Sequence, residues 1–185
     1  GVKKIFMFPR KKVLHPSSIK TFISGYSIFR EIYYDGSIKN RLLEVVDEEK
    51  IDIVHCESYY TFFYLVDELK KRNVKLIAGS ENIEIDVYAQ YIVGLKYFWL
   101  LKPFFQSQLD KIRAEEENAF MNSDVNLAVS KTDASYISSL GGKKCYVVEN
   151  GVDISYFKFK PKTHGKIRNI LFVGNFSYFP NLSAV

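Results

Sequence analysis

Short apolar runs alternate with amphipathic helical patterns along most of this chain, and this alternation limits its possible folds more than any other feature. Strand-like apolar runs occur at residues 3–8, 51–56, 74–79, 124–129 and 143–148. Apolar residues at helical spacing occupy residues 37–49, 62–69, 105–121 and 130–140. Strands that alternate with helices favour a parallel sheet whose strands are connected through helices. The sequence therefore predicts an α/β fold, a Rossmann-like parallel sheet of the doubly wound kind with helices on both faces.

Polar side chains follow four of the predicted strands, at the point where each strand ends. In open parallel sheets, ligands bind in the crevice beyond the carboxyl ends of the strands. We therefore expect polar residues from these ends to line one rim of the sheet. The residues predicted to line this crevice are His55, Glu57, Ser58, Ser80, Glu81, Asn82, Ser130 and Lys131.

Residues 147–183 have the pattern of a boundary between two domains. Asn150-Gly151 is typical of a tight turn, because both residues tolerate positive φ. A basic linker follows, and a new apolar run at residues 170–173 ends at Gly174. A single strand and the first residues of a helix cannot bury a core. We predict a first domain at residues 1–150, a hinge and linker at 151–168, and the first strand of a truncated second domain at 169–185.

The composition and charge of the chain exclude several classes of protein. With 47% hydrophobic and 25% charged residues, its composition is that of a globular protein. The net charge of +5 is spread along the sequence. Neither a clustered basic face nor an aromatic RNA-binding motif is present, which argues against nucleic acid as a partner. Cys56 and Cys145 lack metal-ligand spacing and fit reduced core thiols of an intracellular protein, so we expect no metal site and no cofactor.

Residues 91–105 form an aromatic-rich stretch with two interpretations. The stretch is too short to span a membrane, contains Lys96 and Lys102, and is interrupted by Gly94 and Pro103. It is either a buried core segment or a lip that dips into a membrane surface, with its lysines on lipid phosphates. The sequence therefore predicts a cytoplasmic protein, with a peripheral position at the inner face of the membrane as the alternative.

Four segments of the chain together carry a family resemblance. They are IDIVHCES at residues 51–58, AEEENAFMNSDVNLAVSKTD at 114–133, VVENGVDISYF at 147–157 and ILFVGNFSYFPN at 170–181. In this order they resemble the GT-B glycosyltransferases, specifically the retaining branch called family four or group one. Four ordered matches over about 130 residues are far more specific than one short motif.

The resemblance implies a two-domain enzyme that transfers a sugar from a nucleotide-sugar to a glycan or lipid-linked acceptor, with retention and without a bound metal. Residues 1–150 would form the acceptor-side domain. The resemblance leaves the catalytic residues unassigned, and SENIEID at residues 80–86 is similar to an acceptor-side loop. The hinge would contain Asn150, Gly151 and Asp153, and the donor side Gly174 and Asn175.

Two departures from the family pattern predict that this chain is a fragment. No Gly-Gly loop follows the first predicted strand, and that strand lies too close to residues 51–56 for a complete first half. We therefore expect the first strand with its glycine loop, and most of the donor-binding domain, to be missing, and this chain alone to be inactive. A GT-B-like nucleotide-sugar epimerase and a non-catalytic module that binds membranes or anions are the alternative functions.

Most candidate residues also have a purely structural interpretation. Ser130, with Asp133 three residues later, matches a helix N-cap worth about 1 kcal/mol, although the same helix N-terminus would offer N–H groups to a phosphate or sugar hydroxyl. Glu57 and Glu81 are candidates to bind sugar hydroxyls or deprotonate an acceptor, but carboxylates beside loops are usually only solvated. A structural hydrogen bond explains His55 equally well. Asn150-Gly151 would be a simple turn, and Asp153 would cap the next one.

Overall fold

The computed structural model describes residues 4–9, 21, 23–94, 101–141, 143–159, 171–176 and 181, except for the side chains of residues 91, 93 and 94. Contacts between Cα atoms divide the chain into two units, Gly1–Glu149 and Asn150–Val185. The first unit contains the sheet and the helices described below. The boundary predicted near residue 150 stays a prediction about domains of the whole protein.

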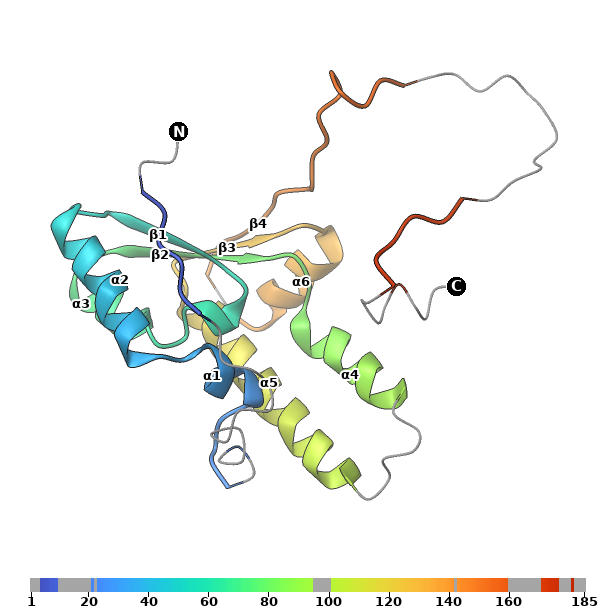
Figure 1. The fold of residues 1–185 in the computed structure, drawn as a ribbon, viewed down its shortest axis with the longest axis horizontal. Coiled ribbons are helices and arrows are strands. Elements are labelled where there is room, and N and C mark those ends of the chain that lie inside the picture. Colours follow the sequence, from blue (N-terminus) through green and yellow to red (C-terminus); the bar gives the residue numbers. More distant parts are fainter. Residues whose placement is uncertain are drawn as a thin grey trace. The chain divides into compact units, whose positions relative to one another are not determined.

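Four parallel strands form the sheet, in the order β1-β2-β3-β4 (Figure 1). They are β1 (Ile53–Glu57), β2 (Lys75–Ser80), β3 (Val125–Ala128) and β4 (Cys145–Val147). Cα partners pair Ile53 with Lys75, Ile77 with Val125 and Leu127 with Tyr146. The predicted α/β, Rossmann-like parallel sheet is confirmed, with strand boundaries shifted by one or two residues from the predicted ones.

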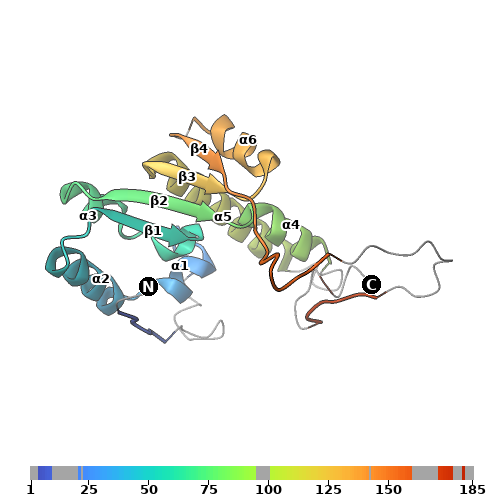
Figure 2. The ribbon, with the colours of Figure 1, turned by 90° about the horizontal axis from the view of Figure 1, so that it is seen from above.

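Helices connect the strands and lie on one side of the sheet, as Figures 1 and 2 show from two directions. They are α1 (Ile28–Tyr33), α2 (Gly36–Glu48), the 3-10 helix η2 (Tyr59–Thr61), α3 (Val66–Lys71), α4 (Glu84–Gly94), α5 (Lys102–Asn122) and α6 (Lys131–Ser139). Along the chain, each described strand is added on the same side of the strand before it. Right-handed crossover connections then place the connecting helices on one face of the sheet. Cover on both faces needs a reversal of that direction, and the four described strands contain none.

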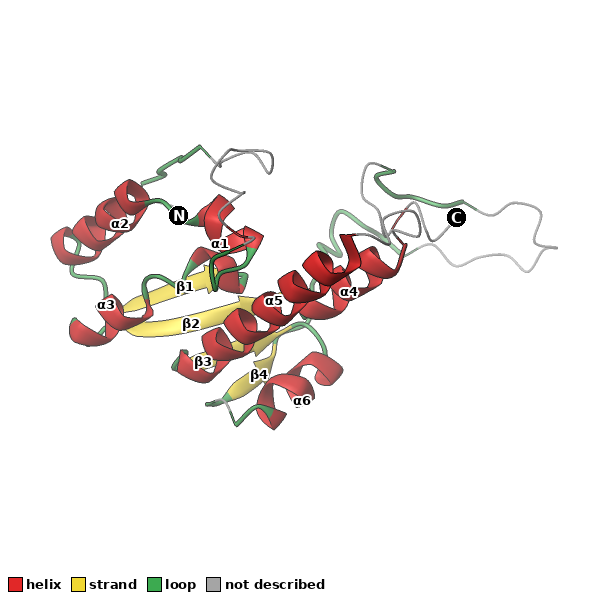
Figure 3. Cartoon of the chain, turned by 90° about the horizontal axis from the view of Figure 1, so that it is seen from below, coloured by secondary structure: helices red, strands yellow, loops and turns green. Residues whose placement is uncertain are grey.

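The hydrophobic core fills the space between this helical layer and the sheet. Helix α5 runs along the sheet beside α4 (Figure 3), and its Ile112, Ala119 and Phe120 are almost fully buried. From β2, Leu76 and Ala78 point into the same core. The apolar stripe predicted for residues 105–121 is therefore confirmed, and burial of a stripe of this size is what holds the long helix on the sheet.

Local sequence signals mark the ends of several helices, and one of them was predicted. The Ser130 hydroxyl accepts the N–H of Asp133 at 3.1 Å, so the predicted N-cap of α6 is confirmed. Helix α3 ends with the basic residues Lys70 and Lys71, and Asn73 follows with φ 55°, a left-handed conformation that asparagine tolerates. Asp35 caps α2 through the Ser37 N–H at 2.8 Å.

The strand predicted at residues 3–8 is wrong for the described residues of that segment. Lys4 to Phe8 pair with no strand, and the side chains of Ile5 and Met7 are 78% and 91% exposed. The segment instead makes surface contacts, with Lys4 paired to Glu49 in an ion pair. An apolar run becomes a strand only where a neighbouring strand pairs with its backbone N–H and C=O groups. Among the described strands, β1 pairs only with β2, so residues 4–8 do not pair with its other edge.

The second unit contains a short capped turn and an exposed apolar run. The Asp153 carboxylate accepts the N–H groups of Ser155 at 2.8 Å and Tyr156 at 3.2 Å, which is the capping arrangement considered for it. The strand predicted at residues 170–173 is wrong for the described part, because Leu171 and Val173 are 85% and 84% exposed and unpaired with any strand. Residue 170 and the residues that follow Asn181 lie outside the described ranges.

Candidate functional site at the strand ends

The sheet brings the carboxyl ends of its strands to one edge, because all four strands are parallel. Glu57 lies opposite Gly79, and Ser80 lies opposite Ala128. The N–H of Ser58 donates to the carbonyl of Gly79 at 3.0 Å and extends this pairing by one residue. The structure therefore brings the polar residues that follow β1, β2 and β3 to neighbouring positions along one edge.

His55 and Glu57 form a pair on the sheet face opposite the helices. The Nε2 atom of His55 lies 3.2 Å from the Oε1 atom of Glu57, and both side chains are about half exposed. Gly79 on β2 makes room for this pair. A Cβ atom at Gly79 would lie 2.3 Å from the Glu57 carboxylate and 2.9 Å from the His55 ring, both too short for real contacts. Glycine at this position therefore lets the Glu57 side chain lie across β2.

Replacement of Gly79 by alanine is expected to push Glu57 away from His55 while the free energy of unfolding changes by less than about 1 kcal/mol. The side chains that must move are half exposed and flexible, so the core is not disturbed. NMR of the His55 ring in the wild type and the variant measures the displacement. Gly36→Ala is the control, because a Cβ atom at Gly36 meets nothing within 4 Å. Unchanged His55 resonances in Gly79→Ala would contradict the close approach.

The loop between β2 and α4 presents two polar side chains to solvent. Glu81 and Asn82 are exposed, whereas Ile83 is only 4% exposed and anchors the loop in the core. The Ser80 hydroxyl donates to the Asn82 carbonyl at 2.5 Å, so it is engaged within the loop. Of the predicted residues in this segment, Glu81 and Asn82 are thus accessible to a ligand and Ser80 supports the loop.

Ser58 adopts a backbone conformation that the sequence did not predict. Its φ is 64°, in a region that favours glycine, and such strain costs about 1–3 kcal/mol. The Ser58 carbonyl accepts the Thr61 hydroxyl at 2.8 Å and the Thr61 N–H at 3.1 Å, which holds this turn at the end of β1. No local sequence signal marks a serine in this region of φ.

The remaining strand-end residues lie at the start of α6. The Ser130 hydroxyl is used by the helix cap, and it also contacts the Asp133 carboxylate at 2.7 Å. Lys131 is exposed and is the first residue of the helix. Lys131 is therefore the accessible cation at this point of the edge, and Ser130 is structural.

Comparison with protein families decides what kind of domain this is. The model of Glycosyltransferase Family 4 matches residues 9–156. The chain belongs to glycosyltransferase family 4. The resemblance found in the sequence is thereby confirmed. A search of curated proteins found no match.

The glycosyltransferase family 4 match includes the four described strands, their polar carboxyl ends and residues Asn150 and Gly151. The tight turn predicted at Asn150-Gly151 is wrong, since the two residues form no turn and neither has a positive φ. It stops before Gly174 and Asn175, whose donor-side role stays a prediction. Within the second unit, a Cβ atom at Gly174 would lie 2.8 Å from the Phe172 ring, so the chain passes close to that ring. The hinge role of Asn150, Gly151 and Asp153 also stays a prediction.

The described side chains at the strand ends can bind a ligand through hydrogen bonds and charge. In the described ranges, no three His, Cys, Asp or Glu side chains gather where they would hold a metal ion. Both cysteines are free, and burial raises the pKa of the Cys56 thiol to about 12. A thiol with this pKa is protonated at neutral pH and is a poor nucleophile. The accessible polar groups at the strand ends include carboxylates, an imidazole and a lysine.

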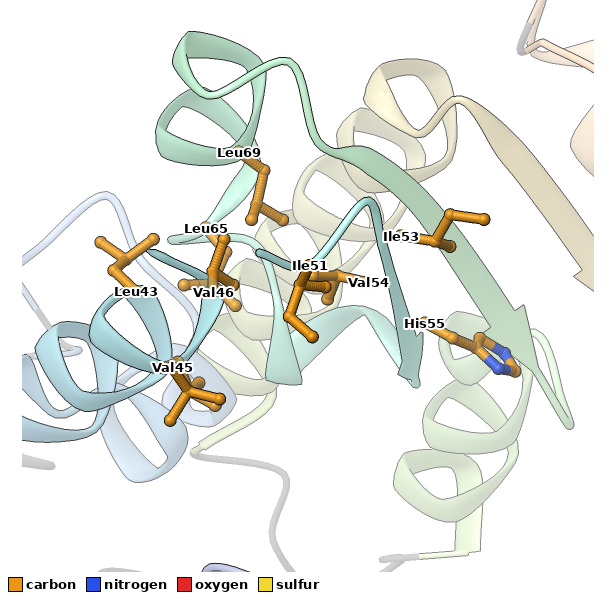
Figure 4. A pocket seen from close by; sticks show the side chains of 10 residues that line it. Leu43, Val45, Val46, Ile51, Ile53, Val54, His55, Leu65 and Leu69 are labelled. Carbon is orange, nitrogen blue, oxygen red and sulfur yellow. The ribbon is translucent and has the colours of Figure 1, made fainter. Parts of the chain in front are cut away.

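A separate apolar hollow of about 260 Å³ lies between α2 and β1. Figure 4 shows it lined by aliphatic side chains that include Leu43, Val46 and Val54, with His55 at its margin. Binding sites for sugars or nucleotides need several convergent polar groups, and this hollow has one. It is therefore part of the packing beside β1 and not the candidate site.

The membrane interpretation of residues 91–105 falls largely outside the described ranges. Residues 95–100 are not described, while Leu101 and Lys102 at the start of α5 are exposed. No helix in the described ranges is both long and apolar enough to cross a bilayer. Whether the stretch is a core segment or a membrane lip stays a prediction.

Proposed function

We propose that this chain is the acceptor-side part of a retaining hexosyltransferase that uses a nucleotide-sugar donor and a glycan or lipid-linked acceptor. The observation that carries the proposal is the family 4 match, which spans the whole parallel sheet and its polar edge. Sugar transfer follows from membership of that family. The retention, the hexosyl group and the acceptor class are the proposed part.

Two groups of side chains at the strand ends have suitable chemistry for an acceptor. Glu81 and Asn82 are exposed on the β2–α4 loop, where a carboxylate and an amide can hydrogen-bond sugar hydroxyls. The His55–Glu57 pair on the neighbouring strand offers an imidazole and a carboxylate 3.2 Å apart. Groups of this kind are able to accept the proton of an attacking hydroxyl. Lys131 would add a positive charge for a donor phosphate.

The donor would be bound by the second domain. Residues 169–185 form no strand in their described part, and they would become the first strand of that domain only when the rest of it lies beside them. Residues 151–168 would be the linker between the domains, with Asn150, Gly151 and Asp153 as the hinge. The exposed apolar side chains of Leu171 and Val173 support this assignment, because a strand of this composition needs a partner surface. Closure about the hinge would bring donor and acceptor together between the domains.

The proposal is tested by comparison of this chain with the protein that carries both domains. The two-domain protein should transfer sugar from a UDP-, GDP- or ADP-sugar, and NMR of the first product should show the anomeric configuration of the donor. Titration calorimetry of this chain alone should detect no donor binding tighter than about millimolar, which is roughly −4 kcal/mol. Micromolar binding to this chain, or a product of inverted configuration, would refute the corresponding part of the proposal.

A further inference from the structure

Glu116 on α5 is a buried acid whose carboxylate is used by another helix. Its residue surface is 1% exposed. One carboxylate oxygen accepts the N–H of Glu84 at 2.7 Å, and the other accepts the N–H of Ile85 at 3.2 Å. Glu116 lies within the helical pattern predicted for residues 105–121, where no functional role was predicted for it.

These two N–H groups are the first of helix α4. The first N–H groups of a helix have no partner within the helix and are usually capped by a neighbouring side chain. Here the acceptor comes from more than 30 residues further along the chain, on a helix that lies beside α4 (Figure 3). Glu116 thus fixes the start of α4 to α5.

The segment in front of α4 is the loop that carries Glu81 and Asn82. At one end the loop is held by the pairing of β2 in the sheet, and at the other by Ile83 in the core and by Glu116 at the helix start. Between these anchors, the bond from the Ser80 hydroxyl to the Asn82 carbonyl stiffens the turn. The positions of the two exposed side chains therefore depend on where α4 begins.

We propose that Glu116 is a positioning residue, which holds the β2–α4 loop so that Glu81 and Asn82 face the acceptor. This inference rests on the function proposed above for the strand ends. Glu116 itself touches no substrate, because it is buried behind the loop.

The groups around Glu116 make its charge sensitive to pH near neutrality. Burial raises the pKa of its carboxyl to about 7, and the negative charges of Glu84 and Asp86 on α4 act in the same direction, while the two backbone N–H bonds oppose the shift. Tyr59 on η2 and Tyr136 on α6 also lie within its electrostatic reach. None of these neighbours is a cation.

The sign of the pH dependence follows from the raised pKa. The folded state prefers the neutral acid, so the contribution of Glu116 to stability is fully present below its ordinary pKa of 4.5 and is lost as pH rises through about 7. The cap at the start of α4 has the opposite dependence, because the charged form of Glu116 is the better hydrogen-bond acceptor. Above pH about 7 both oxygens accept N–H groups, whereas the protonated acid has a hydroxyl in place of one acceptor. The loop in front of α4 is therefore held most firmly by the charged form.

NMR of this chain tests the positioning role without any enzyme assay. The amide resonances of Glu84 and Ile85 should shift together with a midpoint near pH 7 in the wild type, and this titration should be lost in Glu116→Gln. Glu117→Gln is the matched control, because Glu117 accepts the Tyr136 hydroxyl at 3.2 Å and does not cap α4. A titration of the two amides that persists in Glu116→Gln would overturn the inference. So would the absence of the shared titration in the wild type, and this result does not depend on whether the glutamine variant folds.

Kinetics of the two-domain protein supply the second readout. Glu116→Gln should raise the KM for the acceptor at least tenfold while the KM for the nucleotide-sugar changes less than twofold, and Glu117→Gln should change neither. Equal loss for both substrates would overturn positioning and indicate a general packing role. A wild type without sugar transfer would refute the proposed function, and the amide titration would still decide whether Glu116 holds the loop.

Discussion

Replacement of Phe120 by alanine is expected to lower the free energy of unfolding by about 3–5 kcal/mol. The Phe120 side chain is 2% exposed and lies in the core between α5 and the sheet, so its removal leaves a cavity that the surrounding strands cannot fill. The bond from the Asn126 amide to the Phe120 carbonyl uses the backbone and survives the change. Urea unfolding measures the loss, which is a large fraction of the about 5–15 kcal/mol typical of domains.

The next residue on the same helix is the matched control. Met121 is 45% exposed, and Met121→Ala should cost less than about 1 kcal/mol, because surface substitutions rarely cost more. Both substitutions introduce alanine at neighbouring positions of one helix, so their effects on helix propensity are similar. Equal losses in the two variants would mean that the buried face of α5 is not the one described.

Elements marked by local signals were predictable from the sequence. The Ser130 cap of α6, the basic end of α3 and the apolar stripe of α5 all depend on residues within a few positions of one another. Helices α1 and α4 were not predicted. Glu116 caps the start of α4 from another helix, and the N-cap of α1 has a local bond to Arg30 as well as a distant one. The N–H of Ser27, the N-cap of α1, is accepted by Glu115 at 2.9 Å, across 88 residues. No sequence window contains both partners.

The two strands predicted in error fail for one physical reason. Residues 3–8 and 170–173 have the composition of buried strands, but a strand forms only where another strand or a partner surface lies beside it. In the described ranges, Ile5 and Leu171 are largely exposed and no strand pairs with either segment. The composition of a segment indicates how much free energy its burial would contribute. Whether another segment lies beside it and buries it depends on the fold of the whole protein.

The position of the candidate site was also predictable, and its internal geometry was not. The rule for parallel sheets places Glu57, Glu81 and Lys131 at one edge from the strand pattern alone. The pairing of His55 with Glu57 above Gly79 depends on the register of β1 and β2, and the conformation of Ser58 depends on contacts of its turn. The bond that engages the Ser80 hydroxyl within its own loop was not predictable either, because it depends on the conformation of that loop.

Alanine substitutions of Glu57, Glu81 and Asn82 in the two-domain protein are expected to lower turnover of sugar transfer much more than they lower stability. Each side chain is exposed at a strand end, so each change should cost less than about 1 kcal/mol of unfolding free energy. A hydrogen bond made by a charged group is worth about 1.5–3 kcal/mol, which corresponds to roughly a 10- to 100-fold fall in turnover for the two glutamates.

Melting temperature and turnover per folded molecule, measured on the same preparations, decide between a functional and a structural role. Glu44→Ala is the control, since Glu44 is an exposed carboxylate on α2 that pairs with Arg41 and lies on an element away from the strand ends. It should leave turnover unchanged. A fall in melting temperature without a fall in turnover per folded molecule would make Glu57, Glu81 and Asn82 loop-stabilising residues. The acceptor would then have to bind through other groups of the domain.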